Sequence, residues 1–169
     1  MKFHHEMNYD APAPAVFRML TDPDFQAQRA KAGNPEQADS SVVVAPDGEV
    51  IITVHRLMAV QLPGMLQRLT GDKIRIVETQ TWHPSDLEAD EQTGRLQAGL
   101  TGQPGGVEGT LHLAGDQHST DVVVDAEIKV NVPLVGGKIE GFIAEMLIKF
   151  LTKEEEIGRA WLGGGGDKR

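Results

Sequence analysis

The sequence has no cysteine, few basic residues and no long apolar run, and each absence excludes a class of function. Without cysteine there are no disulfides, thiolate zinc sites, iron–sulfur clusters or cysteine nucleophiles. Lys and Arg number 16 against 25 Asp and Glu, a net charge of −9, which argues against nucleic acid and anionic membrane surfaces as partners. No run approaches the roughly 20 apolar residues of a membrane-spanning helix, so no stable membrane insertion is expected.

Several motifs that carry chemistry are also missing. The chain contains no GxSxG elbow, no P-loop and no GxGxxG after a strand. Its six histidines show neither HxxxH nor HExxH spacing, so no metal site is expected. The first residues, Met1 to Glu6, lack the apolar core of a secretory signal, which makes the cytoplasm the expected location. We therefore predict no metal and no cofactor, and the catalytic residues of any enzyme activity stay unknown.

The chain of 169 residues has the length of a single domain, and its first residues predict one strand and two helices. Residues 2–9 alternate apolar and polar side chains, the period of a half-buried strand. Residues 13–20 and 23–31 predict two short helices, because prolines fall only in their first turns and Asp22 can cap the second. The N-terminal part of the chain is therefore predicted to contain a strand followed by two helices.

The remainder predicts a β-meander followed by one long helix. Six strands, bounded by glycine and proline turns, are expected at residues 41–45, 49–58, 73–83, 94–101, 107–115 and 119–132. Residues 138–162 carry large apolar side chains at spacings of three and four, the pattern of an amphipathic helix. The glycine-rich tail, residues 163–169, has nothing to bury and is expected to be disordered.

Only one common arrangement buries both the helix stripe and the apolar sheet face: a seven-stranded antiparallel sheet curved around the C-terminal helix. The element order β-α-α-β6-α places the predicted fold in the α+β class. The sequence resembles the START-like (SRPBCC) superfamily of helix-grip lipid-transfer proteins and polyketide cyclases. Within it, the chain resembles an uncharacterised bacterial family in the runs Ala13 to Phe25 and Val132 to Glu140. The resemblance covers the single domain, residues 1–162, and implies an elongated internal cavity between sheet and helix.

The helix and one apolar loop supply the first candidate ligand-binding residues. On the helix these are the apolar side chains expected to face the sheet: Ile139, Phe142, Ile143, Met146 and Phe150. Leu62 and Met65, in the apolar stretch 62–66 between two strands, could form a flap over the cavity. The competing interpretation is that all of them are ordinary core packing and the cavity is filled.

Two strands raise the question of polar groups in the cavity. If Ile74 and Ile76 point inward, alternation carries Glu78, Gln80 and Trp82 inward as well; otherwise the inward side chains are those of Val77, Thr79 and Thr81. We include Glu78 as a polar contact and Trp82 as a flat wall for a ring-containing ligand. Likewise either His55 or Arg56 must face the interior, and we include His55 as a possible general acid or base.

These features predict a protein that binds or transports a hydrophobic small molecule, such as a lipid, polyketide or isoprenoid-like compound, as a monomer or homodimer. The alternative is a cyclase, aromatase or dehydratase that uses the same cavity, which requires Glu78, His55 or His5 to line it. A second alternative is a protein-interaction module with a filled core that uses the exposed sheet face or loop 61–66.

Overall fold

The computed structural model describes residues 1–59, 61, 64, 67–68, 71–84 and 86–165. Strand β1 (Lys2–Tyr9) leads into helices α1 (Ala13–Leu20) and α2 (Pro23–Ala30). Asp22 caps α2 as predicted, because its Oδ1 accepts hydrogen bonds from the backbone N–H groups of Asp24 and Phe25 at 2.7 and 3.2 Å.

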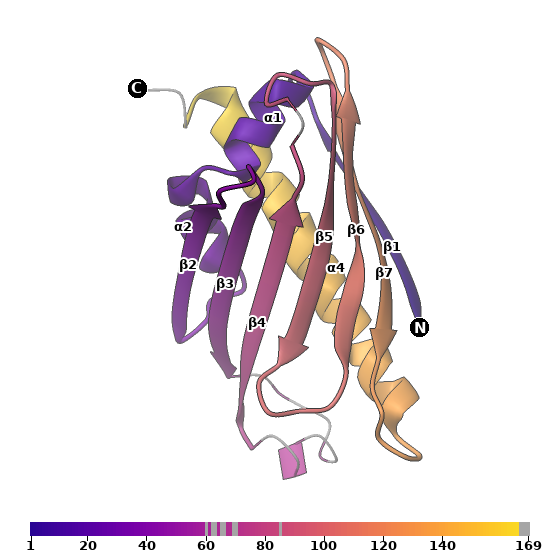
Figure 1. The fold of residues 1–169 in the computed structure, drawn as a ribbon. Helices are drawn as coiled ribbons and strands as arrows, with labels where there is room; N and C mark the ends of the chain where they lie inside the picture. The colour runs from indigo at the N-terminus through magenta and orange to yellow at the C-terminus, as the bar shows by residue number, and fades with distance from the viewer. Residues whose placement is uncertain (60, 62–63, 65–66, 69–70, 85, 166–169) are drawn as a thin grey trace.

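Six more strands complete one seven-stranded antiparallel sheet (Figure 1). They are β2 (Gln37–Val44), β3 (Val50–Ala59), β4 (Lys73–Trp82), β5 (Glu91–Leu100), β6 (Gly106–Gly115) and β7 (Thr120–Lys129). The strand order is β1-β7-β6-β5-β4-β3-β2, so that β1 pairs with β7 and the edges of the sheet are β1 and β2. The predicted tight turn between β2 and β3 is present: Gly48 adopts φ 91°, and its N–H donates to the Ala45 carbonyl.

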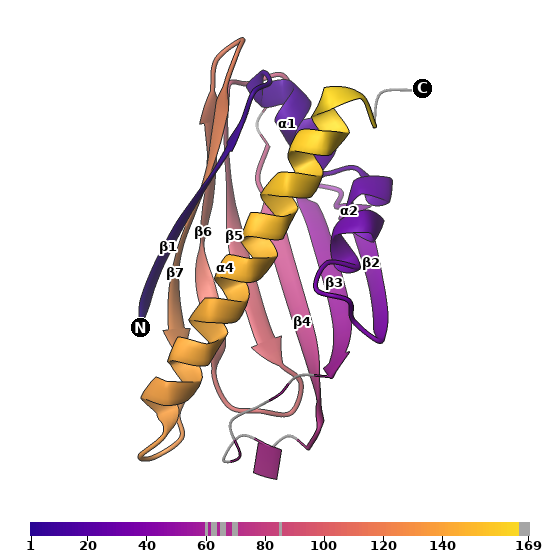
Figure 2. The same ribbon diagram turned by 180° about the vertical axis from the view of Figure 1, so that it is seen from behind.

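Helix α4 (Gly136–Ala160) crosses one face of this sheet diagonally, as Figure 2 shows. Its 25 residues make a rod of about 37 Å, long enough to cover the sheet from β7 toward α2. The buried core lies between helix and sheet; α1 lies at one end of it, and α2 covers β2 and β3 beside α4. Within the described residues, no helix combines the length and the apolar composition needed to cross a membrane. The predicted α+β helix-grip fold is confirmed.

Three of the predicted strand boundaries differ from the observed ones by three or four residues. Strand β2 begins four residues earlier than predicted, at Gln37, and β5 begins three residues earlier, at Glu91. Strand β7 ends at Lys129 rather than at residue 132. After α4 the chain makes one wide turn, Trp161–Gly165, and residues 166–169 lie outside the described part, so the disorder of the glycine-rich tail stays a prediction.

Candidate functional site

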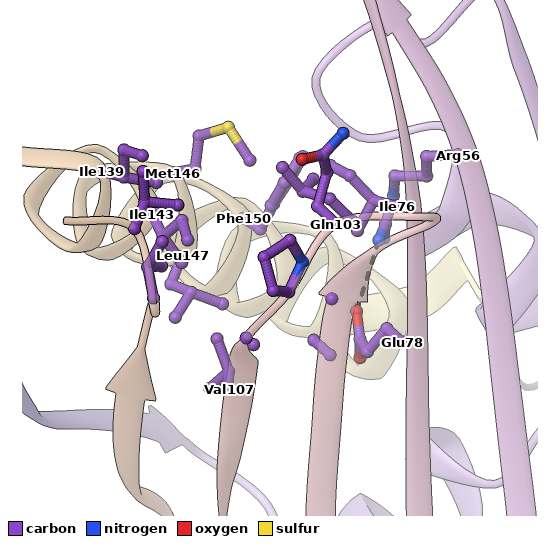
Figure 3. Close-up of a pocket in the computed structure, with 18 residues that line it drawn as sticks. Arg56, Ile76, Glu78, Gln103, Val107, Ile139, Ile143, Met146, Leu147 and Phe150 are labelled. Atoms are coloured by element: carbon purple, nitrogen blue, oxygen red, sulfur yellow. Dashed lines mark hydrogen bonds and ion pairs between the residues drawn. The ribbon is translucent and has the colours of Figure 1, made fainter. Parts of the chain in front are cut away.

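A cavity of about 70 Å³, partly open to solvent, lies between the sheet and α4 (Figure 3). Its walls come from β3 to β6, from the loops that follow β5 and β7, and from α4. The described residues that line it are Arg56, Ile76, Glu78, Ala98, Gly99, Leu100, Gln103, Pro104, Gly105, Gly106, Val107, Val130, Val132, Ile139, Ile143, Met146, Leu147 and Phe150.

The cavity exists because large side chains on the helix face small ones on the sheet. On the sheet side, the cavity is lined by Ala98 and Gly99 of β5 and by Gly106 of β6, whose small or absent side chains leave space above the strands. Opposite them, Ile143 and Phe150 project from α4 into the space seen in Figure 3. A space is therefore left between α4 and these three small residues of the sheet.

A smaller cavity of about 30 Å³ lies deeper in the core. Its wall includes Trp82, Gln80 and Glu154, and it shares Glu78 and Phe150 with the first cavity. We call the two the outer and the inner cavity. Phe150 and Glu78 belong to the walls of both cavities, so they lie at the boundary between the apolar outer cavity and the more polar inner cavity.

Four charged side chains form a buried cluster at this boundary. Arg29 of α2 donates from Nη2 to Glu78 Oε1 at 2.9 Å and from Nη1 to Glu154 Oε2 at 3.0 Å. Arg56 of β3 donates from Nη1 to Glu78 Oε2 at 3.3 Å, and its guanidinium carbon lies 4.8 Å from the centre of the Phe150 ring. The cluster thus ties α2, β3, β4 and α4 together through charge-assisted hydrogen bonds.

Neutral polar groups extend this cluster in two directions. Gln80 donates from Nε2 to Glu78 Oε1 at 2.9 Å and accepts a hydrogen bond from Trp82 Nε1 at 3.2 Å. Gln26 accepts from Arg29 Nε at 2.7 Å and donates to the Leu20 carbonyl at 2.5 Å. A buried carboxylate and guanidinium are thereby held by fixed dipoles rather than by water.

The pKa values of the two buried carboxyls shift in opposite directions. Burial alone would raise the pKa of Glu78, but Arg29 and Arg56 outweigh it and hold that pKa at about 2. Burial raises the pKa of Glu154, and the nearby Glu78 adds to this rise while Arg29 only partly opposes it. Glu78 is therefore an anion at neutral pH, which makes it a poor proton donor and a weak base.

Five of the predicted site residues meet in the outer cavity: Glu78, Ile139, Ile143, Met146 and Phe150. The inward alternative for β4 is the observed one, with Ile74, Ile76, Gln80 and Trp82 on the same face as Glu78. Trp82 lines the inner cavity and packs edge-on against Phe17, with ring centres 5.6 Å apart.

Besides His55, three predicted residues either lie elsewhere or fall outside the described residues. Phe142 lines neither cavity, because the contact stripe of α4 runs through its neighbours Ile139, Ile143 and Met146. Leu62 and Met65 lie outside the described residues, so their predicted flap stays untested.

The prediction that His55 lines the cavity is wrong. In β3 the buried side chains are those of Val54, Arg56 and Met58, so alternation puts His55 on the outer face of the sheet. Arg56 occupies the interior position because its charge is met there by Glu78 and its Nε donates to the Ala30 carbonyl at 3.0 Å. His5 lines neither of the two cavities.

The sequence reasoning missed Arg29 and Glu154. One signal was available for Glu154: it falls three residues after Leu151 and four before Gly158, on the buried stripe of α4. Arg29 carried no comparable signal, because a single arginine in a short polar helix is usually solvent-exposed.

The described residues offer no group of three His, Cys, Asp or Glu side chains that could hold a metal ion. What the two cavities offer instead is mostly apolar space beside a fixed ionic wall. Such a wall can orient a ligand through hydrogen bonds.

This fold, with a cavity between the sheet and α4, defines a protein of the helix-grip fold class. Residues 4–162 match the family described as "Protein of unknown function (DUF2505)", and the chain belongs to that family. An uncharacterised protein of Mycobacterium tuberculosis (strain ATCC 25618 / H37Rv) is 24% identical over 168 residues, which cover 95% of each chain.

Solved structures share the fold at low sequence identity. An aromatase/cyclase from Streptomyces sp. R1128 superposes with a TM-score of 0.62 at 12% identity, covering 98% of both chains. A protein of Thermus thermophilus gives a TM-score of 0.61 at 19% identity, covering 95% of this chain and 98% of the other. Norcoclaurine synthase from Thalictrum flavum, solved with dopamine and hydroxybenzaldehyde, gives 0.54 at 16% identity, covering 97% and 87%. The predicted resemblance to the superfamily is confirmed at the level of fold.

Proposed function

We propose that this protein binds a hydrophobic small molecule in the outer cavity, between the sheet and α4. The observation that carries the proposal is the wall chemistry: apolar side chains from two layers enclose the space, and the charged groups gather at one end of it. Pockets that are mostly apolar with a few placed polar groups are typical ligand sites. A lipid, polyketide or isoprenoid-like compound has the matching chemistry.

The size of the cavity adds a condition to this proposal. A volume of about 70 Å³ is roughly half of the ~150 Å³ cavity that accommodates benzene, so a ligand of the proposed class requires the α4 side chains to change rotamer. Met146 suits such adjustment because its side chain is unbranched and flexible. We infer that the protein acts as a carrier or sensor whose apolar wall adapts to its ligand.

The test is to fill the cavity from the sheet side and ask whether a bound molecule is lost. Ala98→Leu adds bulk to the floor of both cavities. Gln97→Leu, one residue earlier on the opposite face of β5, is the matched control. The wild type, purified alongside both variants, is extracted with organic solvent, and the extracts are compared by mass spectrometry.

We expect a hydrophobic species in wild type and in Gln97→Leu, and a much smaller amount in Ala98→Leu. Equal amounts in all three proteins would place the bound molecule outside the cavity and contradict the proposal. Circular dichroism spectra check that the variants are folded.

Catalysis in the adjoining inner cavity is the second candidate, and one observation favours it. Glu154 lines the inner cavity with a raised pKa, which brings a carboxyl closer to the range useful for proton transfer. Glu78, with its pKa of about 2, suits that role less well. If the extracted molecule is turned over, Glu154→Gln should abolish turnover, and unchanged turnover would eliminate Glu154 as acid or base.

A further inference from the structure

Arg56 has hydrogen-bonding capacity that the protein does not use. A guanidinium carries five N–H groups. Three of them donate: Nε to the Ala30 carbonyl at 3.0 Å, Nη2 to the Arg29 carbonyl at 3.3 Å, and Nη1 to Glu78 Oε2 at 3.3 Å. One N–H on each terminal nitrogen therefore has no acceptor among the described residues. Arg56 is only 2% exposed and lines the outer cavity, so these donors lie buried at its wall.

Glu78 offers the complementary group beside it. Its Oε1 accepts from both Arg29 and Gln80, whereas its Oε2 accepts only from Arg56 among the described residues. A carboxylate oxygen can accept two hydrogen bonds, so Oε2 keeps one site open. Arg56 and Glu78 thus present a donor and an acceptor next to each other at the polar end of the cavity, as Figure 3 shows.

The charge of the cluster limits what this pair can accept. Arg29 and Arg56 are balanced by Glu78 and Glu154, and all four side chains are buried or nearly so. A ligand carboxylate or ammonium would add an unpaired charge to a site shielded from water, which is costly. A neutral group leaves the balance intact.

We propose that the polar end of the ligand is a neutral hydroxyl group, bound between Arg56 and Glu78, with the apolar body of the ligand along α4. A hydroxyl matches the pair because it donates to Glu78 Oε2 and accepts from an Arg56 N–H at the same time. A carbonyl uses only the donor, and a hydrocarbon uses neither. This inference rests on the proposed function, since it assigns the chemistry of the ligand's head within the same cavity.

The experiment is a calorimetric titration of the wild-type protein with four probes that share one body. They are 4-butylbenzyl alcohol, 1-butyl-4-ethylbenzene, 4-butylbenzoate and 4-butylbenzylamine, each at pH 7. Hydrogen bonds to charged groups are the stronger class, so we expect the alcohol to bind about ten-fold more tightly than the hydrocarbon. The alcohol should also bind more tightly than the two charged probes.

Two variants locate the preference within the cavity. Glu78→Gln replaces the open acceptor by an amide, so it should reduce the ratio of alcohol to hydrocarbon affinity toward one. Ile139→Val, at the far apolar end of the cavity, should weaken the binding of the alcohol and of the hydrocarbon by the same factor and leave that ratio unchanged. If Glu78→Gln does not fold, the wild-type series still decides.

The outcomes separate the two proposals. Equal binding of alcohol and hydrocarbon, or tighter binding of the benzoate or the amine, would overturn the hydroxyl assignment and leave the proposed cavity function standing. Binding of none of the four probes would overturn both.

Discussion

At the scale of single residues, Arg29 is the centre of the buried polar structure. It joins Gln26, Glu78 and Glu154 by hydrogen bonds of 2.7 to 3.0 Å, and its side chain is 3% exposed. Its removal leaves two buried carboxylates without their main partner. Such a loss costs more than the net contribution of the intact pair, because the remaining charges stay desolvated.

We therefore expect Arg29→Met to lower the free energy of unfolding by about 3 to 5 kcal/mol. The control is Arg18→Met, which breaks the exposed ion pair between Arg18 and Glu88 and should cost under about 1 kcal/mol. Urea denaturation, monitored by circular dichroism, measures the free energy of unfolding of both variants. Similar losses in the two variants would mean that the buried cluster contributes no more than a surface pair.

The depressed pKa of Glu78 predicts a dependence of stability on pH. Its folded pKa of about 2 lies below the ordinary value of 4.5, so between these values the unfolded chain binds the proton more readily. The contribution of Glu78 is thus complete above pH 4.5 and is lost as the pH falls toward 2. The total loss from this group is roughly 3 kcal/mol.

The expected result is that Glu78→Gln flattens the decline in unfolding free energy between pH 4.5 and pH 2, relative to wild type. Glu88→Gln, which changes an exposed carboxyl, is the control and should give a curve parallel to wild type. Denaturation at a series of pH values gives the curves. A Glu78→Gln curve parallel to wild type would show that Arg29 and Arg56 do not hold this carboxyl in its ionised form.

At the scale of helices and strands, Gly158 sets how closely α4 approaches the rest of the fold. A β-carbon there would lie 2.6 Å from Tyr9 Cε1 and 3.0 Å from Met19 Cε. Tyr9 is fully buried, so its ring has no room to move away. Gly158 therefore serves the contact of α4 with β1 and α1, although glycine weakens a helix interior.

Gly158→Ala should destabilise the protein by about 1 to 3 kcal/mol, because the clash exceeds the gain in helix propensity. Gly141→Ala, in the same helix but with open space around the new methyl group, should instead stabilise by about 0.5 to 1 kcal/mol. Thermal unfolding of the two variants shows the opposite signs. A higher melting temperature for Gly158→Ala would contradict the close packing of α4 on Tyr9.

The elements themselves could be predicted from the sequence because their periodicity is local. The alternation of β1 and the stripe of α4 each follow from burial of one face, and turn residues mark most ends. The start of β2 was missed because Gln37 to Ser40 is polar: this edge strand has no buried residue to produce alternation.

The site was harder to predict because it depends on contacts between distant segments. Alternation fixed which side chains of β4 share a face but not which face is inside, so the direction of Glu78 stayed open. Its direction is decided by Arg29 and Arg56, which lie 49 and 22 residues away in the chain. The same long-range pairing explains why Arg56 rather than His55 is buried.

At the scale of the whole molecule, the two edges of the sheet are protected differently. Strand β1 is covered by α4: Glu155 accepts a hydrogen bond from the Asn8 backbone N–H at 2.7 Å, and Arg159 donates to the Asn8 carbonyl at 3.0 Å. Strand β2 has no buried residue, and Val43 and Val44 are exposed. An edge strand with few buried contacts is a weak point of a sheet.

We expect hydrogen–deuterium exchange to be faster in β2 than in β1. Local opening of β2 exposes little apolar surface, whereas opening of β1 must uncover Phe3, Met7 and Tyr9. Mass spectrometry of peptic peptides that cover residues 37–44 and 2–9 measures the two rates. Equal protection of both peptides would show that β2 is stabilised by something other than buried side chains, such as its contacts with α2.

The placement of Trp82 has an optical consequence. Its indole N–H bonds to Gln80, and Gln80 bonds to Glu78, so the chromophore is connected by two hydrogen bonds to the carboxylate at the boundary of the two cavities. The second indole, Trp161, packs against Phe25 with ring centres 5.6 Å apart, and it lines neither cavity. With Trp161 replaced by Phe, the remaining tryptophan emission would come from Trp82 in the cavity wall alone, and the protein would carry its own fluorescent reporter of whatever enters.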